Sequence, residues 1–111
     1  MKLVRDNIPG MHARGELGIR PDGHRERQAF RRATPQEHLL LLRAKLTEEA
    51  GEVLSAVFRE HRLEELADVH EVLMELIYIE GWSLADVEHC ADSKAGKYGD
   101  FSEGWILEEK K

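Results

Sequence analysis

Two clusters of acidic residues lie within an otherwise amphipathic stretch of this chain, from Leu46 to Leu76. The first is Glu48-Glu49-Ala50-Gly51-Glu52, and the second is Glu64-Glu65-Leu66-Ala67-Asp68. At about 100° per residue, the apolar residues around each cluster align on one stripe, which is the pattern of a helix packed on a core. The stripes consist of Leu39, Leu42, Leu46, Ala50, Val53 and Val57, and then of Leu66, Val69, Leu73, Leu76 and Ile77. The stretch therefore predicts an antiparallel helical hairpin with its turn near Glu60-His61.

Such a hairpin brings four carboxylates to one level. On the first helix Glu49 flanks the apolar stripe, and Glu52 follows at i+3. On the second helix Glu65 points toward the partner helix, and Asp68, at i+3, lies opposite Glu52. Carboxylates that converge near a core repel one another and lose hydration, so they must bind a cation or shift their pKa. Oxygen ligands suit Mg²⁺, or Mn²⁺, better than zinc, which makes these four acids predicted metal ligands. The alternative is that they are solvated faces of two amphipathic helices.

The spacing of these acids resembles a known metal motif. E-E-x-x-E, a gap of about a dozen residues and E-x-x-D resemble the motif of the all-α nucleoside triphosphate pyrophosphohydrolases, the MazG-like superfamily. This superfamily includes the all-α dUTPases and phosphoribosyl-ATP pyrophosphohydrolase. Residues 2–9, KLVRDNIP, resemble the start of its phosphoribosyl-ATP pyrophosphohydrolase-like subgroup, and residues 97–107 resemble that subgroup's C-terminal segment. A single Gly99 stands where the subgroup often has two glycines, and residues 10–34 are outside the resemblance.

The resemblance implies Mg²⁺-dependent hydrolysis of a nucleotide between its α and β phosphates, which releases a monophosphate and pyrophosphate. Glu49, Glu52, Glu65 and Asp68 would bind the ion. Glu48, or Glu49 itself, would orient the attacking water as a catalytic base. The substrate is predicted to be a nucleoside triphosphate or a related nucleotide.

Four cations are candidate phosphate-binding residues, and each also has a simpler structural explanation. Arg5 belongs to the initial segment that the resemblance places near the active site, although an ion pair with Asp6 would also account for it. Lys45 lies at i,i+4 from Glu49 and can form a salt bridge there. Lys94 and Lys97 lie near the end of a predicted helix, where positive charge favours the helix dipole.

Three other functions compete with this one. The first is the phosphoribosyl-ATP pyrophosphohydrolase reaction of histidine biosynthesis, which the same residues would serve. The second is a non-enzymatic helical module for dimerisation or metal binding. The third is a di-iron carboxylate bundle, which requires Glu-x-x-His pairs. None of the six histidines has a glutamate three residues before it, which argues against the di-iron bundle.

Local signals predict where the helices begin and end. Thr34-Pro35-Gln36-Glu37 has the form of a capping box with proline at the first helical position, so a helix is expected from Pro35 to about Arg59. The second helix is expected from about Arg62 to Ile79, before Gly81. Ser83 is an N-cap for a third helix, which reaches about Tyr98. The predicted fold is a single all-α domain of residues 1–111, a MazG-like bundle completed by oligomerisation.

The two ends and the glycine-rich segment are less regular. Residues 2–7 are predicted to form a brief strand or an extended arm that Pro9-Gly10 ends. Residues 101–107 would either pair with Leu3-Val4 as a short terminal β pairing or cover a nucleotide as a flap. Residues 10–34 lack an apolar period and are predicted to be a mobile loop. A second interpretation is that the arginines of this loop grip phosphates.

Charge and cysteine content narrow the partners. The net charge of −6 argues against a nucleic-acid polymer, because domains that bind one are usually basic. A single cysteine, Cys90, allows neither an internal disulfide nor a cysteine zinc cluster. The sequence has no apolar signal region and no run of transmembrane length, so we predict a cytoplasmic protein without membrane contact. A helical unit this small is expected to bury its remaining apolar surface in a homodimer or homotetramer.

Overall fold

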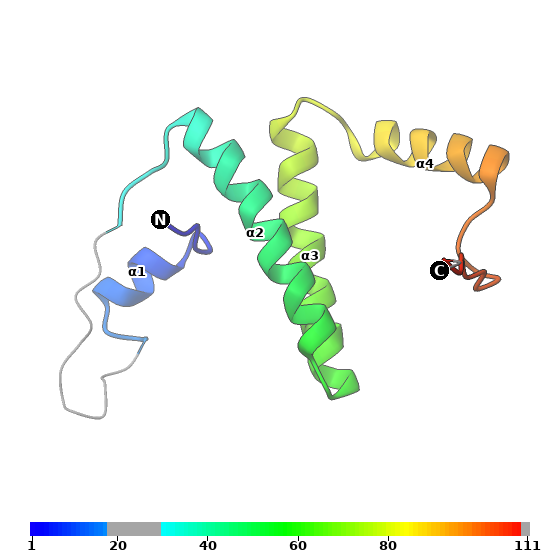
Figure 1. Ribbon diagram of the computed structural model, residues 1–111. Coiled ribbons are helices and arrows are strands. Elements are labelled where there is room, and N and C mark those ends of the chain that lie inside the picture. Colours follow the sequence, from blue (N-terminus) through cyan, green and yellow to red (C-terminus); the bar gives the residue numbers. More distant parts are fainter. Residues whose placement is uncertain (18–29, 110–111) are drawn as a thin grey trace.

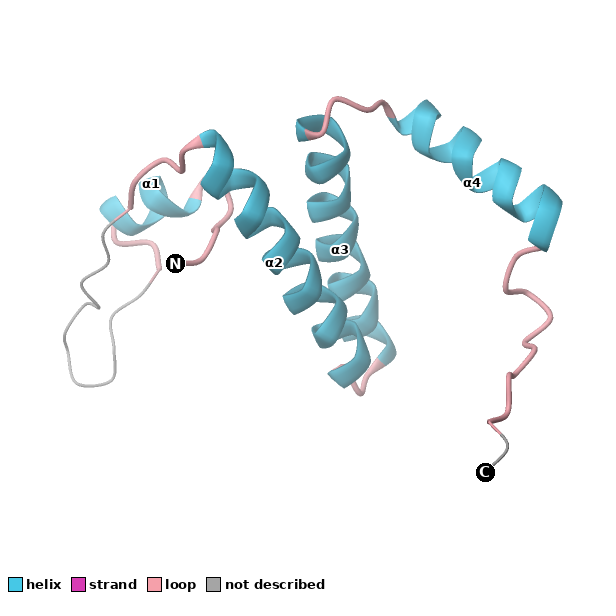
Figure 2. Cartoon of the chain, turned by 45° about the horizontal axis from the view of Figure 1, so that its top comes forward, coloured by secondary structure: helices cyan, strands magenta, loops and turns pink. Residues whose placement is uncertain are grey.

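In the computed structural model, residues 1–17 and 30–109 are described, and they form helices and loops without a strand. The helices are α1 (Ile8–Ala13), α2 (Pro35–Ser55), α3 (Arg59–Ile79) and α4 (Leu84–Tyr98). Helices α2 and α3 lie side by side as an antiparallel hairpin (Figure 1). Helix α1 and the amino terminus lie on one side of this hairpin, and α4 with the carboxyl terminus lies on the other (Figure 2). The all-α prediction is confirmed.

The capping box at the start of α2 is formed as predicted. The Thr34 hydroxyl accepts a hydrogen bond from the Glu37 amide at 3.2 Å, and the Glu37 carboxylate accepts one from the Thr34 amide at 3.0 Å. The Arg31 guanidinium donates two further hydrogen bonds to this carboxylate, at 2.8 and 2.7 Å. These contacts lower the pKa of Glu37 to about 2, with Arg31 as the largest cause.

The turn of the hairpin comes earlier than predicted. Helix α2 ends at Ser55 rather than near Arg59, because Ala56 and Phe58 both have extended backbone angles. β-Branched Val57 and aromatic Phe58 are weak helix formers, which favours a break here. Helix α3 begins at Arg59 rather than at about Arg62, so Arg62 lies in its first turns. Its guanidinium donates to the Val57 carbonyl at 2.8 Å and so satisfies a backbone group that the break exposes.

The connection from α3 to α4 follows the sequence signals closely. Gly81 has a φ of +86°, the left-handed conformation that glycine adopts without strain at the end of a helix. Ser83 then caps α4, since its hydroxyl accepts a hydrogen bond from the Asp86 amide at 3.1 Å. The Asp86 carboxylate accepts one from the Ser83 amide at 2.8 Å. Helix α4 ends at Tyr98, before Gly99 with a φ of +82°.

The amino-terminal region differs from the prediction. Residues 8–13 form helix α1, where Pro9-Gly10 was expected to end an extended segment. Proline is tolerated in the first turn of a helix, because no intrahelical hydrogen bond needs its missing N–H. The predicted loop of residues 10–34 is therefore partly helical, and the prediction that residues 18–29 are mobile lies outside the described residues. The terminal β pairing is not formed, since residues 1–17 and 101–109 contain no strand.

The apolar core is small and lies at the open end of the hairpin, away from the turn. Its buried apolar residues are Leu42 of α2 and Ile77 of α3. Every residue of α4 is exposed, and so are both tryptophans, Trp82 and Trp105. The radius of gyration is 18.8 Å, against about 13 Å for a compact chain of this length. Among the described helices, none is both long and apolar enough to span a membrane.

Candidate metal centre

The hairpin brings together the four acids that the sequence singled out. Glu49 and Glu52 come from α2, and Glu65 and Asp68 come from α3. One carboxylate oxygen from each of the four lies within 4.8 Å of the others. Because α2 and α3 are antiparallel, the Glu49/Glu52 pair and the Glu65/Asp68 pair lie at the same level of the hairpin. This level is closer to the turn than the apolar core is. We call these four residues the acidic cluster.

Burial distinguishes this cluster from an ordinary acidic surface. Glu49 is only 6% exposed, and the other three acids are half-buried. The Oε2 atoms of Glu49 and Glu65 are both buried and accept no hydrogen bond within the described part of the chain. A carboxylate oxygen that loses water without gaining a donor is costly. Two such oxygens at one place match the needs of a cation that prefers oxygen ligands.

Repulsion between the acids of the cluster changes the pKa of Glu52. The pKa of Glu52 is raised, first because of the adjoining Glu65 carboxyl group, with which it can share a proton. Burial and the negative charges of Glu65 and Glu48 raise it further, while contact with Glu49 opposes the shift. Glu52 therefore holds its proton more readily than an isolated glutamate does.

Three cations contact the cluster or its edge. The Lys45 ammonium lies 3.1 Å from Glu49 Oε1 and 3.6 Å from Glu48 Oε1. Burial lowers the pKa of Lys45, but these two carboxylates outweigh burial and raise it overall. Arg5 donates a hydrogen bond to Asp68 Oδ1 across 63 residues of sequence. Lys2 lies 3.1 Å from Glu48 Oε1, a contact that the sequence did not single out.

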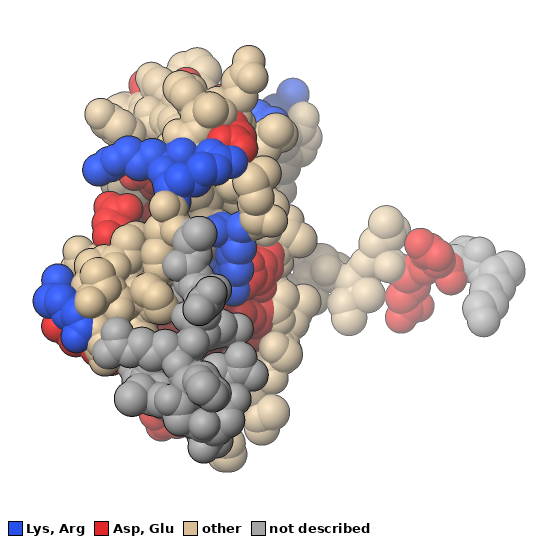
Figure 3. Space-filling view, turned by 90° about the vertical axis from the view of Figure 1, so that its left-hand side faces the viewer, with Lys and Arg blue, Asp and Glu red and all other residues tan. Residues whose placement is uncertain are grey.

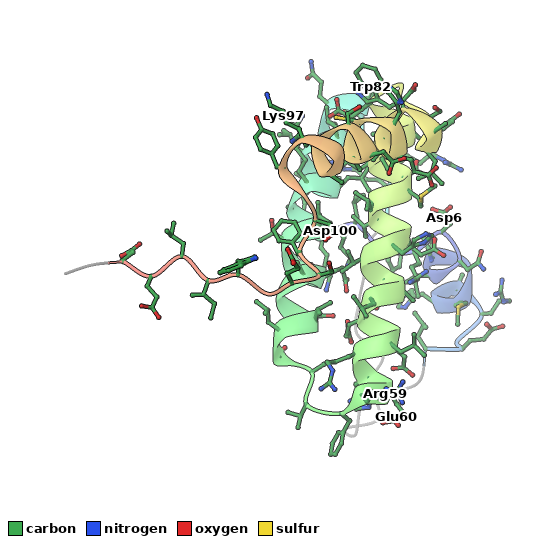
Figure 4. The ribbon with its side chains drawn as sticks, turned by 90° about the vertical axis from the view of Figure 1, so that its right-hand side faces the viewer. Asp6, Arg59, Glu60, Trp82, Lys97 and Asp100 are labelled. Atoms are coloured by element: carbon green, nitrogen blue, oxygen red, sulfur yellow. The ribbon has the colours of Figure 1, made fainter. Side chains whose placement is uncertain are left out.

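The predicted substrate-binding cations separate into two groups. Arg5 and Lys45 lie at the acidic cluster; Arg5 pairs with Asp68, not with its neighbour Asp6. Lys94 and Lys97 lie on α4, which packs only against α3 among the described helices. The Lys97 ammonium instead lies 5.1 Å from the centre of the Tyr98 ring. Figure 4 shows Lys97 near the far end of α4, on the opposite side of α3 from Asp6. Within one chain, α4 carries Lys94 and Lys97 away from the cluster.

The predicted catalytic pair is also divided. Glu49 belongs to the cluster, whereas Glu48 is exposed beside it and faces Lys2 and Lys45. The pKa of Glu48 is lowered, first by the hydrogen bond from Lys2 and then by the charges of both lysines. Figure 3 shows the side of the molecule on which α1 lies, where Lys and Arg side chains of the described residues lie next to Asp and Glu side chains.

Lys2 is the residue of this region that sequence reasoning missed. The one sequence feature that pointed to Lys2 is that it lies, with Arg5, in the KLVRDNIP segment. Gly51, between Glu49 and Glu52, has open space around it, since an added Cβ would meet no atom within 4 Å.

Comparisons of the chain with protein-family models, curated proteins and solved structures found no match.

Proposed function

We propose that this chain is a nucleotide pyrophosphohydrolase that depends on Mg²⁺, with Mn²⁺ as a possible substitute. The observation that carries the proposal is the pair of buried, unpartnered oxygens on Glu49 and Glu65, within a cluster of four convergent carboxylates. The resemblance of the same acids to the metal motif of the MazG-like superfamily supports it. The reaction would cleave a nucleoside triphosphate between its α and β phosphates and give a monophosphate and pyrophosphate.

Glu49, Glu52, Glu65 and Asp68 would hold the ion. When bound there, a divalent cation neutralises phosphate charge and lowers the pKa of water. Glu49 or the adjacent Glu48 accepts the proton of the attacking water. Glu48 is ionised at neutral pH and can accept this proton, although its lowered pKa makes it a weaker base than an isolated glutamate. Lys45, held beside Glu49 at 3.1 Å, places a positive charge next to the reacting phosphates.

We also propose that the protein is a homodimer or a homotetramer. The support is the exposure of apolar side chains on α4 and the tail, where Leu84 is 44% exposed, Val87 37% and Phe101 fully exposed. A second copy placed there would complete the bundle. Lys94 and Lys97 could then reach the acidic cluster of a neighbouring chain. The same exposed faces keep a non-enzymatic dimerisation module as the second candidate function.

The test is release of pyrophosphate from a panel of ribo- and deoxyribonucleoside triphosphates, with Mg²⁺ and with a chelator. Wild type is compared with Glu49→Gln and with the control Glu64→Gln, which alters an exposed acid of α3 outside the cluster. We expect metal-dependent pyrophosphate that Glu49→Gln abolishes and Glu64→Gln retains. Free phosphate as the product would show that a different bond is cleaved. Turnover of phosphoribosyl-ATP but of no triphosphate would instead identify the biosynthetic reaction.

A further inference from the structure

The first seven residues form an arm that ion pairs hold against the hairpin. Lys2 pairs with Glu48 of α2, and Arg5 pairs with Asp68 of α3. The arm connects directly to α1, because the Ile8 amide donates a hydrogen bond to the Arg5 carbonyl at 3.0 Å. Side chains from two helices and the arm therefore meet at the edge of the acidic cluster.

Little else fixes this arm. Its backbone makes no hydrogen bond to α2 or α3 within the described part of the chain. Leu3 is half-buried, whereas Val4 is 42% exposed and the Arg5 side chain is 62% exposed. The Arg31 guanidinium also contacts the Met1 sulfur at 3.2 Å. Since exposed ion pairs contribute little to stability, the arm can leave its position without unfolding the hairpin.

Arg5 and a metal ion would compete for one carboxylate. Asp68 accepts the hydrogen bond from Arg5 and is also one of the four convergent acids. A divalent ion on Asp68 would repel the guanidinium and draw negative charge away from the carboxylate that accepts its hydrogen bond. Lys45 differs from Arg5, because it is part of α2 and its side chain is only 21% exposed. The helix keeps Lys45 in place, whereas the arm leaves Arg5 free to move.

We propose that the arm is a cationic latch on the acidic cluster, an inference that rests on the proposed metal centre. Binding of a divalent ion releases Arg5 from Asp68. The released guanidinium then binds the phosphate oxygens of a nucleotide, whose geometry it matches in pairs. Arg5 thus opposes metal binding when no nucleotide is present and favours nucleotide binding once the metal is in place. Metal and nucleotide would reinforce each other through this one side chain.

The test measures binding rather than turnover. Titration calorimetry gives the Mn²⁺ affinity of the full chain without nucleotide, for wild type, Arg5→Ala and the control Arg43→Ala. Arg43 also pairs with a glutamate, Glu80 at 3.0 Å, but neither residue belongs to the cluster. We expect Arg5→Ala to bind Mn²⁺ roughly 5-fold tighter or more, the lower end of usual coupling between sites, and Arg43→Ala to match wild type.

A second titration uses a nucleoside triphosphate with a non-hydrolysable α,β-methylene bridge, at saturating Mn²⁺. Here Arg5→Ala should bind roughly 5-fold weaker or more than wild type, an effect of opposite sign. A purely structural role of Arg5 would weaken both interactions. Equal Mn²⁺ affinity of Arg5→Ala and wild type would overturn the latch and leave the metal centre standing. Failure of every protein to bind Mn²⁺ would overturn the metal centre and the latch with it.

Discussion

The Lys45 ammonium lies 3.1 Å from the carboxylate of Glu49, the most buried charged residue of the described chain, one turn further along α2. Among the described residues, Lys45 is the one cation that forms an ion pair with Glu49. The other neighbours of Glu49 in the cluster are carboxylates. Glu49 therefore depends on Lys45 for charge balance until a metal ion is bound.

Replacing Lys45 with methionine keeps the length of the side chain but removes its charge. Without metal, Glu49 is then left buried among acids, so the free energy of unfolding should fall by about 1–3 kcal/mol. Urea unfolding in chelator measures this. Lys94→Met, on the exposed α4, is the matched control and should change stability by less than about 0.5 kcal/mol. Equal stabilities of the two variants would show that the Lys45–Glu49 pair contributes nothing.

Metal binding should raise thermal stability through the acidic cluster. At a Mn²⁺ concentration of 100 times Kd, a single site stabilises the fold by about 2.7 kcal/mol. In chelator, Glu65→Gln should be as stable as wild type or more so, because it removes repulsion with Glu52. It should also lose the Mn²⁺ response, while Glu64→Gln keeps it. Calorimetric melting with and without Mn²⁺ checks this, and an unchanged wild-type Tm would favour the non-enzymatic module.

Acid should weaken the start of α2 through Glu37. The pKa of this carboxyl is lowered to about 2, whereas an unfolded glutamate titrates near about 4.3. A lowered pKa means that the stabilisation is complete above about pH 4.3 and is lost as the pH falls toward 2. An NMR titration of the Glu37 side-chain carbon should have its midpoint well below about 4.3, the ordinary value for glutamate. Arg31→Ala should move the midpoint back up, and a wild-type midpoint near 4.3 would contradict the pairing.

Two glycines should respond in opposite directions to alanine. Gly51 lies inside α2 with open space around it, so Gly51→Ala should stabilise the chain by about 1 kcal/mol. Gly81 has a φ of +86°, and alanine there should destabilise it by about 1 kcal/mol or more. Thermal melts measure both effects. A stable Gly51→Ala protein with reduced nucleotide affinity would show that the substrate or a second copy approaches Gly51 closely.

The exposed face of α4 should govern assembly. Light scattering coupled to size exclusion should give the mass of a dimer or tetramer for wild type. Val87→Lys should shift it toward monomer, because a buried, unpaired charge opposes association. Glu88→Lys makes a positive charge at the next position along α4 and serves as the control. A monomeric wild type would overturn the proposed oligomer, and equal effects of the two variants would place its interface elsewhere.

Sequence reasoning succeeded where the deciding interactions are local. Thr34 with Glu37 and Ser83 with Asp86 cap helices within four residues, so their side chains alone predict the two helix starts. The convergence of the four acids follows from two helical periods and one reversal. It survived an error in the position of the turn, because α2 and α3 still pair as an antiparallel hairpin.

The failures have equally physical causes. Pro9 was taken as a break, although proline fits the first turn of a helix, and α1 begins there. The turn at residues 56–58 also includes hydrogen bonds from Arg62 to the Ala56 and Val57 carbonyls, contacts that helix propensity does not encode. The place of Arg5 at Asp68 depends on a contact across 63 residues, which no local pattern contains. The distance of Lys94 and Lys97 from the acidic cluster depends on the direction in which α4 leaves Gly81, which no local sequence pattern determines.

All four members of the acidic cluster fall between residues 49 and 68, on two helices joined by a three-residue turn. Contacts between segments so close in sequence form quickly, because only a short loop must close. The hairpin can thus bring its four acids together early in folding, before α4 has found any partner and without the arm.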